Sequence, residues 1–282
     1  MAHEIETLTF GYGLIEGPRC DGEGNLYFSD VPNGGVYRRS PDGAVELAVP
    51  KRKGVGGMVL HARGGLVLSG KNICHNQPDG TVRVLLALDD APGFNDITTD
   101  AQGRVYAGSM KSNPFDDMSW KNRVPGDCWR IEGEGKATKM YGGIKLTNGI
   151  GFSPDGARIY HADTAQNGVV VHDVAADGSM GNERFLAQGD DLWPDGLAVD
   201  DDDTVWVADF KGGCVRAFDQ AGREQARITV PATEVTSLCF GGADRRDLYI
   251  VTADNSDDPS RKGTVFRTRV DTPGLIAPLA TI

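Results

Sequence analysis

The chain has 282 residues, of which 29 are lysine or arginine and 40 are aspartate or glutamate, so its formal net charge is −11. A negative surface of this size repels phosphate backbones and anionic lipids, and we therefore expect neither nucleic acid nor a membrane as a partner. Hydrophobic residues make up 39% of the chain, enough for a packed core, and the 38 glycines favour many short strands joined by tight turns.

Two features of the sequence bear on the compartment. Residues 1–6 lack a basic region followed by an apolar stretch, and no apolar run approaches the length of a membrane span. The five cysteines are odd in number, well separated and without a zinc-type or CxxC spacing. We expect a cytoplasmic protein with reduced thiols.

A repeat of about 40 to 50 residues, the period typical of propeller blades, runs along the whole chain. Its most regular part is a short strand of the type aromatic-small-Asp, as in Tyr27 to Asp30 and Trp206 to Asp209. Six such segments occur, at residues 26–30, 66–70, 105–109, 159–163, 205–209 and 248–252. Six copies predict six similar structural units.

Further strand patterns complete each unit, for example at residues 35–39 and 44–49, with Asp-Gly hairpin turns such as Asp42-Gly43 between them. The sequence therefore predicts an all-β fold, a six-bladed β-propeller formed by residues 1–282 as one domain, whose central channel is lined by the first strand of every blade. Residues 4–10 are expected to add an outer strand to the last blade. A β-sandwich or a two-domain chain would leave the shared spacing of six copies without an explanation.

One residue near the start of each predicted inner strand is expected to face the channel. In chain order these residues are Glu16, Gly56, Asn95, Asn148, Asp195 and Thr236. Four of the six carry a carboxylate or a carboxamide, and hard divalent cations prefer such oxygens. Two other interpretations stay open: Asn148-Gly149 and Asp195-Gly196 are also ordinary turn signals, and Glu16 can pair with Arg19.

The segments that contain these residues resemble one family of six-bladed propellers, the gluconolactonase, senescence-marker-protein and luciferin-regenerating-enzyme group. The resemblance covers nearly the whole chain and depends on the order and spacing of residues 14–18, 94–96, 147–156 and 194–200. It implies a metal-binding central channel in which Glu16, Asn148 and Asp195 bind a divalent cation, Ca²⁺ in the first place and Zn²⁺, Mg²⁺ or Mn²⁺ as alternatives. Asn95 would lie beside it, contacting substrate or a water on the metal.

The resemblance also implies a metal-dependent hydrolase that opens a small lactone, a sugar lactone or a similar cyclic ester, by attack of an activated water. Asp195 would be the catalytic base as well as a ligand. Sugar-lactone members often have an arginine two positions before the Asn-Asp pair, where this chain has Gly93. The resemblance therefore implies a lactone hydrolase more strongly than it implies a sugar lactone as the substrate. An organophosphorus-ester hydrolase of the same propeller type and a non-catalytic binding platform remain as alternatives.

Two tryptophans are further candidates for binding substrate. Trp120 belongs to an insertion, residues 112–127, which would form either a lid over the channel or an ordered surface loop. Trp193 precedes Pro194-Asp195 and would form an apolar wall of the site, or else pack as an ordinary core residue.

Overall fold

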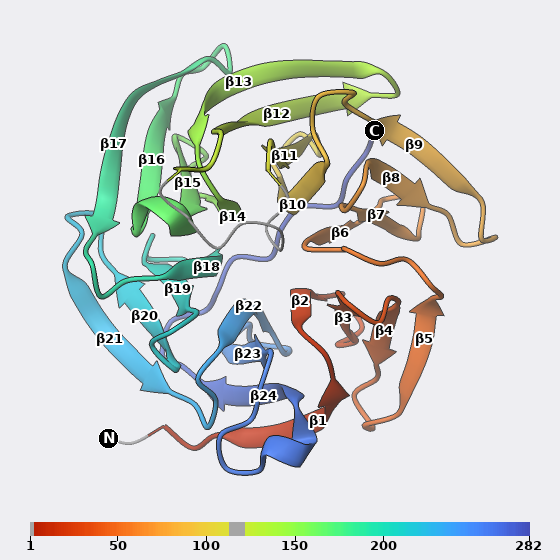
Figure 1. The fold of residues 1–282 in the computed structure, drawn as a ribbon, viewed down its shortest axis with the longest axis vertical. Helices are drawn as coiled ribbons and strands as arrows, with labels where there is room; N and C mark the ends of the chain where they lie inside the picture. The colour runs from red at the N-terminus through yellow and green to blue at the C-terminus, as the bar shows by residue number, and fades with distance from the viewer. Residues whose placement is uncertain (1–2, 113–121) are drawn as a thin grey trace.

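The protein is described by a computed structural model, which covers residues 3–112 and 122–282. Six four-stranded antiparallel sheets surround a central channel like the blades of a propeller (Figure 1). This confirms the predicted all-β, six-bladed fold. None of the helices in the described ranges is long and apolar enough to cross a membrane.

Each of the first five blades uses four consecutive strands, numbered from the channel outwards. Blade 1 contains β2 (Ile15–Cys20), β3 (Leu26–Asp30), β4 (Val36–Arg39) and β5 (Val45–Val49). Blade 2 contains β6 (Met58–Leu60), β7 (Leu66–Leu68), β8 (Ile73–Asn76) and β9 (Val82–Leu86). Blade 3 contains β10 (Gly93–Thr99), β11 (Val105–Met110), β12 (Gly126–Gly133) and β13 (Lys136–Ile144).

The remaining blades follow the same order. Blade 4 contains β14 (Thr147–Phe152), β15 (Arg158–Asp163), β16 (Gly168–Val174) and β17 (Met180–Gln188). Blade 5 contains β18 (Pro194–Val199), β19 (Val205–Asp209), β20 (Cys214–Phe218) and β21 (Glu224–Thr229). Blade 6 contains β22 (Val235–Gly241), β23 (Asp247–Thr252), β24 (Gly263–Arg269) and, from the other end of the chain, β1 (Glu6–Tyr12).

The strand β1 closes the ring, as the sequence predicted, although it begins at Glu6 and extends to Tyr12. It pairs antiparallel with β24 in a register that places Glu6 opposite Arg267. The two side chains also form an ion pair, with the Arg267 guanidinium 2.5 Å from the Glu6 carboxylate. The last blade is thus built from β1 and from β22 to β24, and β1 and β24 lie side by side in Figure 1.

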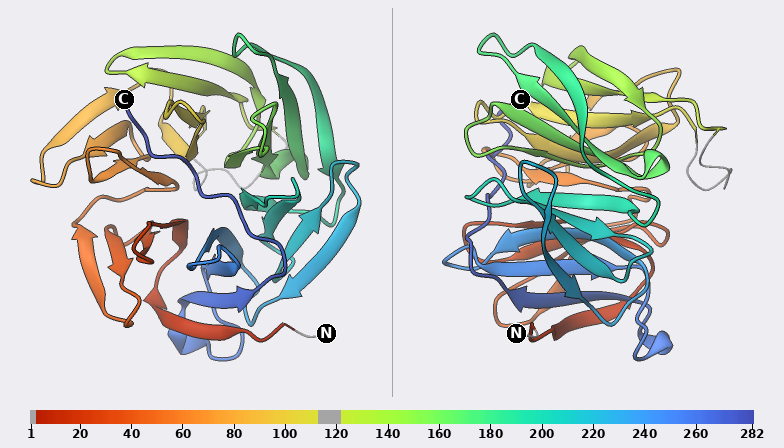
Figure 2. Two further views of the ribbon diagram at one scale, coloured as in Figure 1. Left: turned by 180° about the vertical axis from the view of Figure 1, so that it is seen from behind. Right: turned by 90° about the vertical axis from the view of Figure 1, so that its left-hand side faces the viewer.

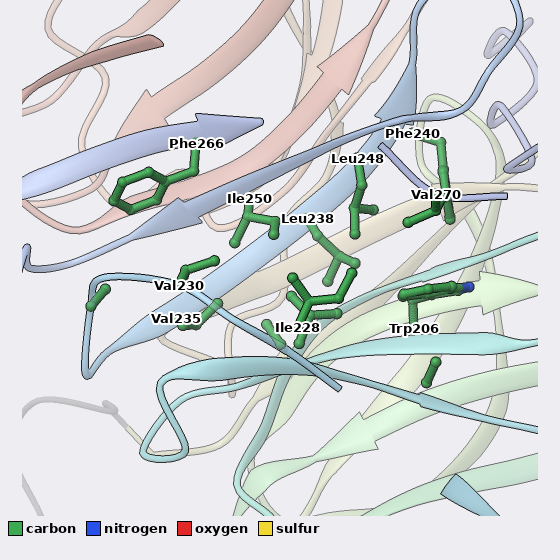
Figure 3. Close-up of a cluster of buried hydrophobic side chains, with 14 residues drawn as sticks. Trp206, Ile228, Val230, Val235, Leu238, Phe240, Leu248, Ile250, Phe266 and Val270 are labelled. Carbon is green, nitrogen blue, oxygen red and sulfur yellow. The ribbon is translucent and has the colours of Figure 1, made fainter. Parts of the chain in front are cut away.

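The core consists of apolar side chains packed between neighbouring sheets. Between blades 5 and 6, Trp206 and Leu238 are buried together with Phe240 and Phe266 (Figure 3). Because both faces of a blade are covered in this way, all five residues of β19, the second strand of blade 5, are buried.

Buried hydroxyl groups connect neighbouring blades near the channel. The Ser29 hydroxyl donates to the Val55 carbonyl at 2.6 Å, and the Thr164 hydroxyl donates to the Pro194 carbonyl at 2.6 Å. The Thr236 hydroxyl likewise donates to the Ile15 carbonyl at 2.5 Å, which joins blade 6 to blade 1. Thr236 was expected to face the channel, but its only side-chain oxygen is used between the blades.

A segment near the carboxyl end, residues 274–281, crosses the channel at the end where the inner strands finish (Figure 2, left). Its backbone bonds to three blades: Leu275 N–H donates to Val199, Ala280 N–H to Leu60, and Thr281 N–H to Gly103, all at 2.8 to 2.9 Å. A cavity of about 650 Å³ lies at this end. The predicted channel residues lie at the other end, where the inner strands begin.

Candidate active site

The inner strands of five blades are interrupted by β-bulges at the predicted channel residues. The register with the second strand shifts between Glu16 and Arg19, Phe94 and Ile97, Thr147 and Ile150, Pro194 and Leu197, and Val235 and Ser237. A bulge redirects a side chain out of the usual alternation, and bulges are common next to active sites. Because Asn148 and Asp195 lie inside β14 and β18, the interpretation of their Asn-Gly and Asp-Gly pairs as turns is wrong.

Glycines beside these residues allow the inner strands to approach one another closely. A Cβ atom at Gly56 would lie 1.9 Å from Asn95 Oδ1, and one at Gly196 would lie 2.1 Å from Ser237 Oγ. A Cβ atom at Gly149 would lie 2.2 Å from the backbone nitrogen of Leu197. No larger residue fits at these positions, and the close approach brings polar side chains from different blades together.

Two carboxamides form one side of the site. The Asn95 amide nitrogen donates to the Thr147 carbonyl at 2.8 Å and to Asn148 Oδ1. The Asn148 amide nitrogen donates in turn to the Thr164 hydroxyl at 2.6 Å. Because Thr164 also binds the Pro194 carbonyl, it fixes which way the Asn148 amide points. The Asn148 carbonyl oxygen therefore faces the Asn95 amide of the neighbouring blade.

Two carboxylates form the other side. Glu16 and Asp195 are each only 7% exposed, yet no donor among the described residues is hydrogen-bonded to the Asp195 carboxylate. Burial raises the pKa of Asp195, and the negative charge of Asp96 raises it further. Burial also raises the pKa of Glu16, and the charges of Asp195 and Asp96 add to that effect. Two buried acids that repel each other form a site for a cation or a shared proton.

A buried ion pair that the sequence did not predict lies next to these carboxylates. Arg19 Nη2 is 3.3 Å from Asp96 Oδ1 and donates to the Ile97 carbonyl at 2.9 Å. The pair connects blades 1 and 3 past Gly57, where a Cβ atom would lie 2.4 Å from Asp96 Oδ1. Arg19 therefore pairs with Asp96 rather than with Glu16. In the sequence, Asp96 is a charged residue beside Asn95 in a strand that is otherwise mostly uncharged, and this pattern could have indicated a buried ion pair.

The donor set fits a hard divalent cation. Glu16 and Asp195 supply two formal negative charges, and the Asn148 carbonyl supplies a neutral oxygen, a combination of ligand types that suits Ca²⁺ and related ions. Within residues 3–112 and 122–282, no three His, Cys, Asp or Glu side chains form a metal site. A cation bound here would depend on amide oxygens as well as on carboxylates. The second oxygen of Asp96, Oδ2, is buried and has no hydrogen-bond partner among the residues that the structure describes.

The other predicted substrate contacts are placed as follows. Trp193 is partly buried just before β18, and the Lys211 ammonium lies 3.7 Å from the centre of its ring. Trp120 lies outside the described residues, as does most of the insertion 112–127. The insertion follows β11, whose last residue, Met110, pairs with Gly93 near Asn95.

The sequence is similar to those of known proteins. Residues 14–254 match the model of the SMP-30/gluconolactonase/LRE-like region. The chain is 32% identical over 279 residues to a 6-deoxy-6-sulfogluconolactonase of Pseudomonas putida, covering 90% of each chain. It is 30% identical over 243 residues to a pentonolactonase of Haloferax volcanii, covering 84% of this chain and 80% of the relative.

The fold is also similar to solved structures. A calcium-binding regucalcin from Agrobacterium tumefaciens superposes with a TM-score of 0.86 at 21% identity, over 100% of this chain and 99% of the other. The family match begins just before Glu16 and extends beyond Asp195. The chain belongs to the SMP-30/gluconolactonase/LRE-like family.

Proposed function

We propose that this protein is a lactonase that opens the ring ester of a small lactone in the channel, with a divalent cation as its cofactor. The observation that carries the proposal is the pair of buried carboxylates, Glu16 and Asp195, beside the carboxamides of Asn95 and Asn148. The names of two relatives, a pentonolactonase and a sulfogluconolactonase, support ester-ring opening as the reaction.

Glu16, Asn148 and Asp195 are the residues that would hold the cation. When bound, it would act as a Lewis acid that polarises the ester carbonyl and stabilises the negative charge developing on its oxygen. The mixture of carboxylate and amide oxygens favours Ca²⁺, and the similar regucalcin structure is described as calcium-binding. Zn²⁺, Mg²⁺ and Mn²⁺ are the alternatives to test.

Asp195 is the residue that we assign as general base. Its carboxylate accepts no hydrogen bond from the residues in the described ranges, so its lone pairs are free to take a proton from the attacking water. A bound cation would lower the pKa of Asp195, whereas burial and the Asp96 charge raise it. The two effects on the pKa of Asp195 therefore act in opposite directions.

The substrate is proposed to be a sugar lactone or a close analogue. Position 93 cannot contribute a side chain, because a Cβ atom there would lie 2.8 Å from the Gly70 carbonyl oxygen. Phe94 N–H donates to that same carbonyl at 2.8 Å, which holds blades 2 and 3 together. Recognition of substrate hydroxyls beside Asn95 therefore depends on Asn95 itself and on residues of other blades.

The direct test is hydrolysis of a lactone panel, sugar-derived and aliphatic, by metal-stripped protein before and after addition of each of the four cations. We expect turnover to be lost on stripping and restored by at least one cation. No turnover with any cation would contradict the lactonase proposal, and turnover of organophosphorus esters alone would favour that alternative chemistry.

The role of Asp195 is tested separately with Asp195→Asn, which keeps an oxygen ligand and removes the base. Loss of general-base catalysis should lower kcat by about 10²- to 10⁴-fold, while calorimetry still detects cation binding. Asp177→Asn, in an exposed turn after β16, is the matched control and should leave kcat unchanged. Near-normal turnover by Asp195→Asn would show that another group is the base.

A further inference from the structure

Two thiols meet where the first and last blades of the ring touch. Cys20 is the last residue of β2 in blade 1, and Cys239 lies in β22 of blade 6. Their sulfur atoms are 4.0 Å apart and share an S–H···S hydrogen bond. The two residues are separated by 219 positions in the chain (239 − 20), so only closure of the ring brings them together.

The packing around Cys20 keeps its sulfur in this place. A Cβ atom at Gly241, two residues beyond Cys239, would lie 2.4 Å from Cys20 Sγ. The Cys20 sulfur therefore occupies the space that any side chain at position 241 would fill. Contact between the two thiols is a consequence of how the inner strands of blades 1 and 6 pack.

Of the five cysteines, these two are the most exposed, and Cys74, which lines a second cavity, is fully buried. Cys20 and Cys239 both line the cavity of about 650 Å³ at the end of the channel crossed by residues 274–281. Each is 6% exposed, whereas Cys74 and Cys128 are 0% exposed and Cys214 is 1% exposed. A small reagent that enters the cavity therefore meets Cys20 and Cys239 before any other thiol.

We propose that Cys20 and Cys239 are a reversible modification site, at which a peroxide joins the first and last blades through a disulfide. In the first step a thiolate sulfur attacks a peroxide oxygen, breaks the O–O bond and becomes a sulfenic acid, with release of water. The second sulfur then attacks the sulfenic sulfur, forms the S–S bond and releases a second water. Two thiols and one hydrogen peroxide thus give one disulfide and two waters.

The surroundings determine the rate and the product of this reaction. The hydrogen bond from Cys239 and burial hold the pKa of the Cys20 thiol well above its usual range, so the reaction requires sustained exposure to oxidant. The disulfide itself is uncharged and fits a buried, largely apolar position without a desolvation cost. The described ring is held at this junction by non-covalent contacts alone, with all five cysteines free.

A disulfide here would close residues 20–239, more than three quarters of the chain, into one covalent loop. Such a loop restricts the unfolded chain more than a short one does, and we expect a rise in Tm of about 5 °C or more. The thiols lie near the ends of β2 and β22, whereas Glu16 and the other channel residues lie near the beginnings of their strands. Lactone hydrolysis should therefore continue in the oxidised protein.

The experiment is treatment of the reduced protein with hydrogen peroxide, followed by intact-mass analysis, peptide mapping and thermal unfolding. We expect a loss of about 2 Da, a cross-linked peptide pair containing Cys20 and Cys239, and a Tm increase that a reductant reverses. Cys239→Ser should abolish all three changes, and Cys74→Ser, another buried cysteine, should keep them.

Recovery of both Cys20 and Cys239 as free thiols after treatment that oxidises exposed methionines would overturn the proposal, as would addition of oxygen to either cysteine without a cross-link. If Cys239→Ser does not fold, the wild-type peptide map decides alone, because it identifies which cysteines are joined. A disulfide that involves Cys74, Cys128 or Cys214 would also refute the assignment.

Discussion

Acidification should destabilise the propeller through one buried histidine. His161, in β15, is 0% exposed, and its two ring nitrogens lie 3.0 Å from the Tyr141 hydroxyl and 2.6 Å from the Thr147 hydroxyl. Burial lowers the pKa of His161 to about 3, and nearby His172 contributes in the same direction. In the unfolded chain the pKa of histidine is about 6.5, so between these two values the unfolded state binds the additional proton. Stability is therefore lost as the pH falls below about 6.5.

The size of the effect follows from the pKa difference. One pH unit inside this window is worth about 1.36 kcal/mol, so between pH 7.5 and pH 5 His161 should remove about 2 kcal/mol from the free energy of unfolding. His161→Gln keeps a donor and an acceptor but does not titrate. The variant should be less stable at pH 7.5, because glutamine does not reproduce the ring, yet it should lose about 2 kcal/mol less than wild type on acidification.

The assay is urea unfolding at pH 7.5 and pH 5 for wild type, His161→Gln and His3→Gln, an exposed control. The other titrating groups are shared by the proteins, so their contributions cancel when the losses of stability are compared. His3→Gln should lose as much stability as wild type. Equal losses for wild type and His161→Gln, within about 0.5 kcal/mol, would show that His161 is protonated in the folded protein and would refute the reasoning.

Two further predictions concern the site. Thr164→Val removes the hydroxyl that orients the Asn148 amide, so we expect cation affinity measured by calorimetry to fall about 10- to 100-fold. Unchanged affinity would contradict this orienting role of Thr164. Arg19→Met leaves the Asp96 charge buried and unpaired, so urea unfolding should show a loss of about 3 to 5 kcal/mol. The double variant Arg19→Met/Asp96→Asn should recover most of that loss, and a double variant as unstable as the single one would mean that lost packing rather than charge is responsible.

The sequence was most informative where structure is local. Each blade is a meander of neighbouring strands, so its strands and turns could be predicted from short patterns and their repetition. The same repetition aligned Glu16, Asn95, Asn148 and Asp195, which the structure brings to one end of the channel. Their proposed roles as ligands and base remain predictions.

The features that the sequence did not predict depend on contacts between distant segments. The Arg19–Asp96 pair requires blade 2 to have a glycine between blades 1 and 3, a relation that no single repeat contains. From the sequence alone, the Thr236 hydroxyl could bind either a cation or a backbone carbonyl. The packing of blade 6 against blade 1 places it against the Ile15 carbonyl. Residues 274–281 have no strand periodicity, and their course across the channel follows from backbone bonds to three separate blades.

The pairing of β1 with β24 has a consequence for synthesis of the protein. The ribosome makes β1 before blades 1 to 5 and its partner β24 after them, so β1 has no partner while these blades are being completed. During that interval one apolar face of blade 1 and one of blade 5 also lack the sheet that covers them in the finished ring. The nascent chain is therefore most exposed to aggregation just before its last strand emerges, when chaperones would have the greatest effect on yield.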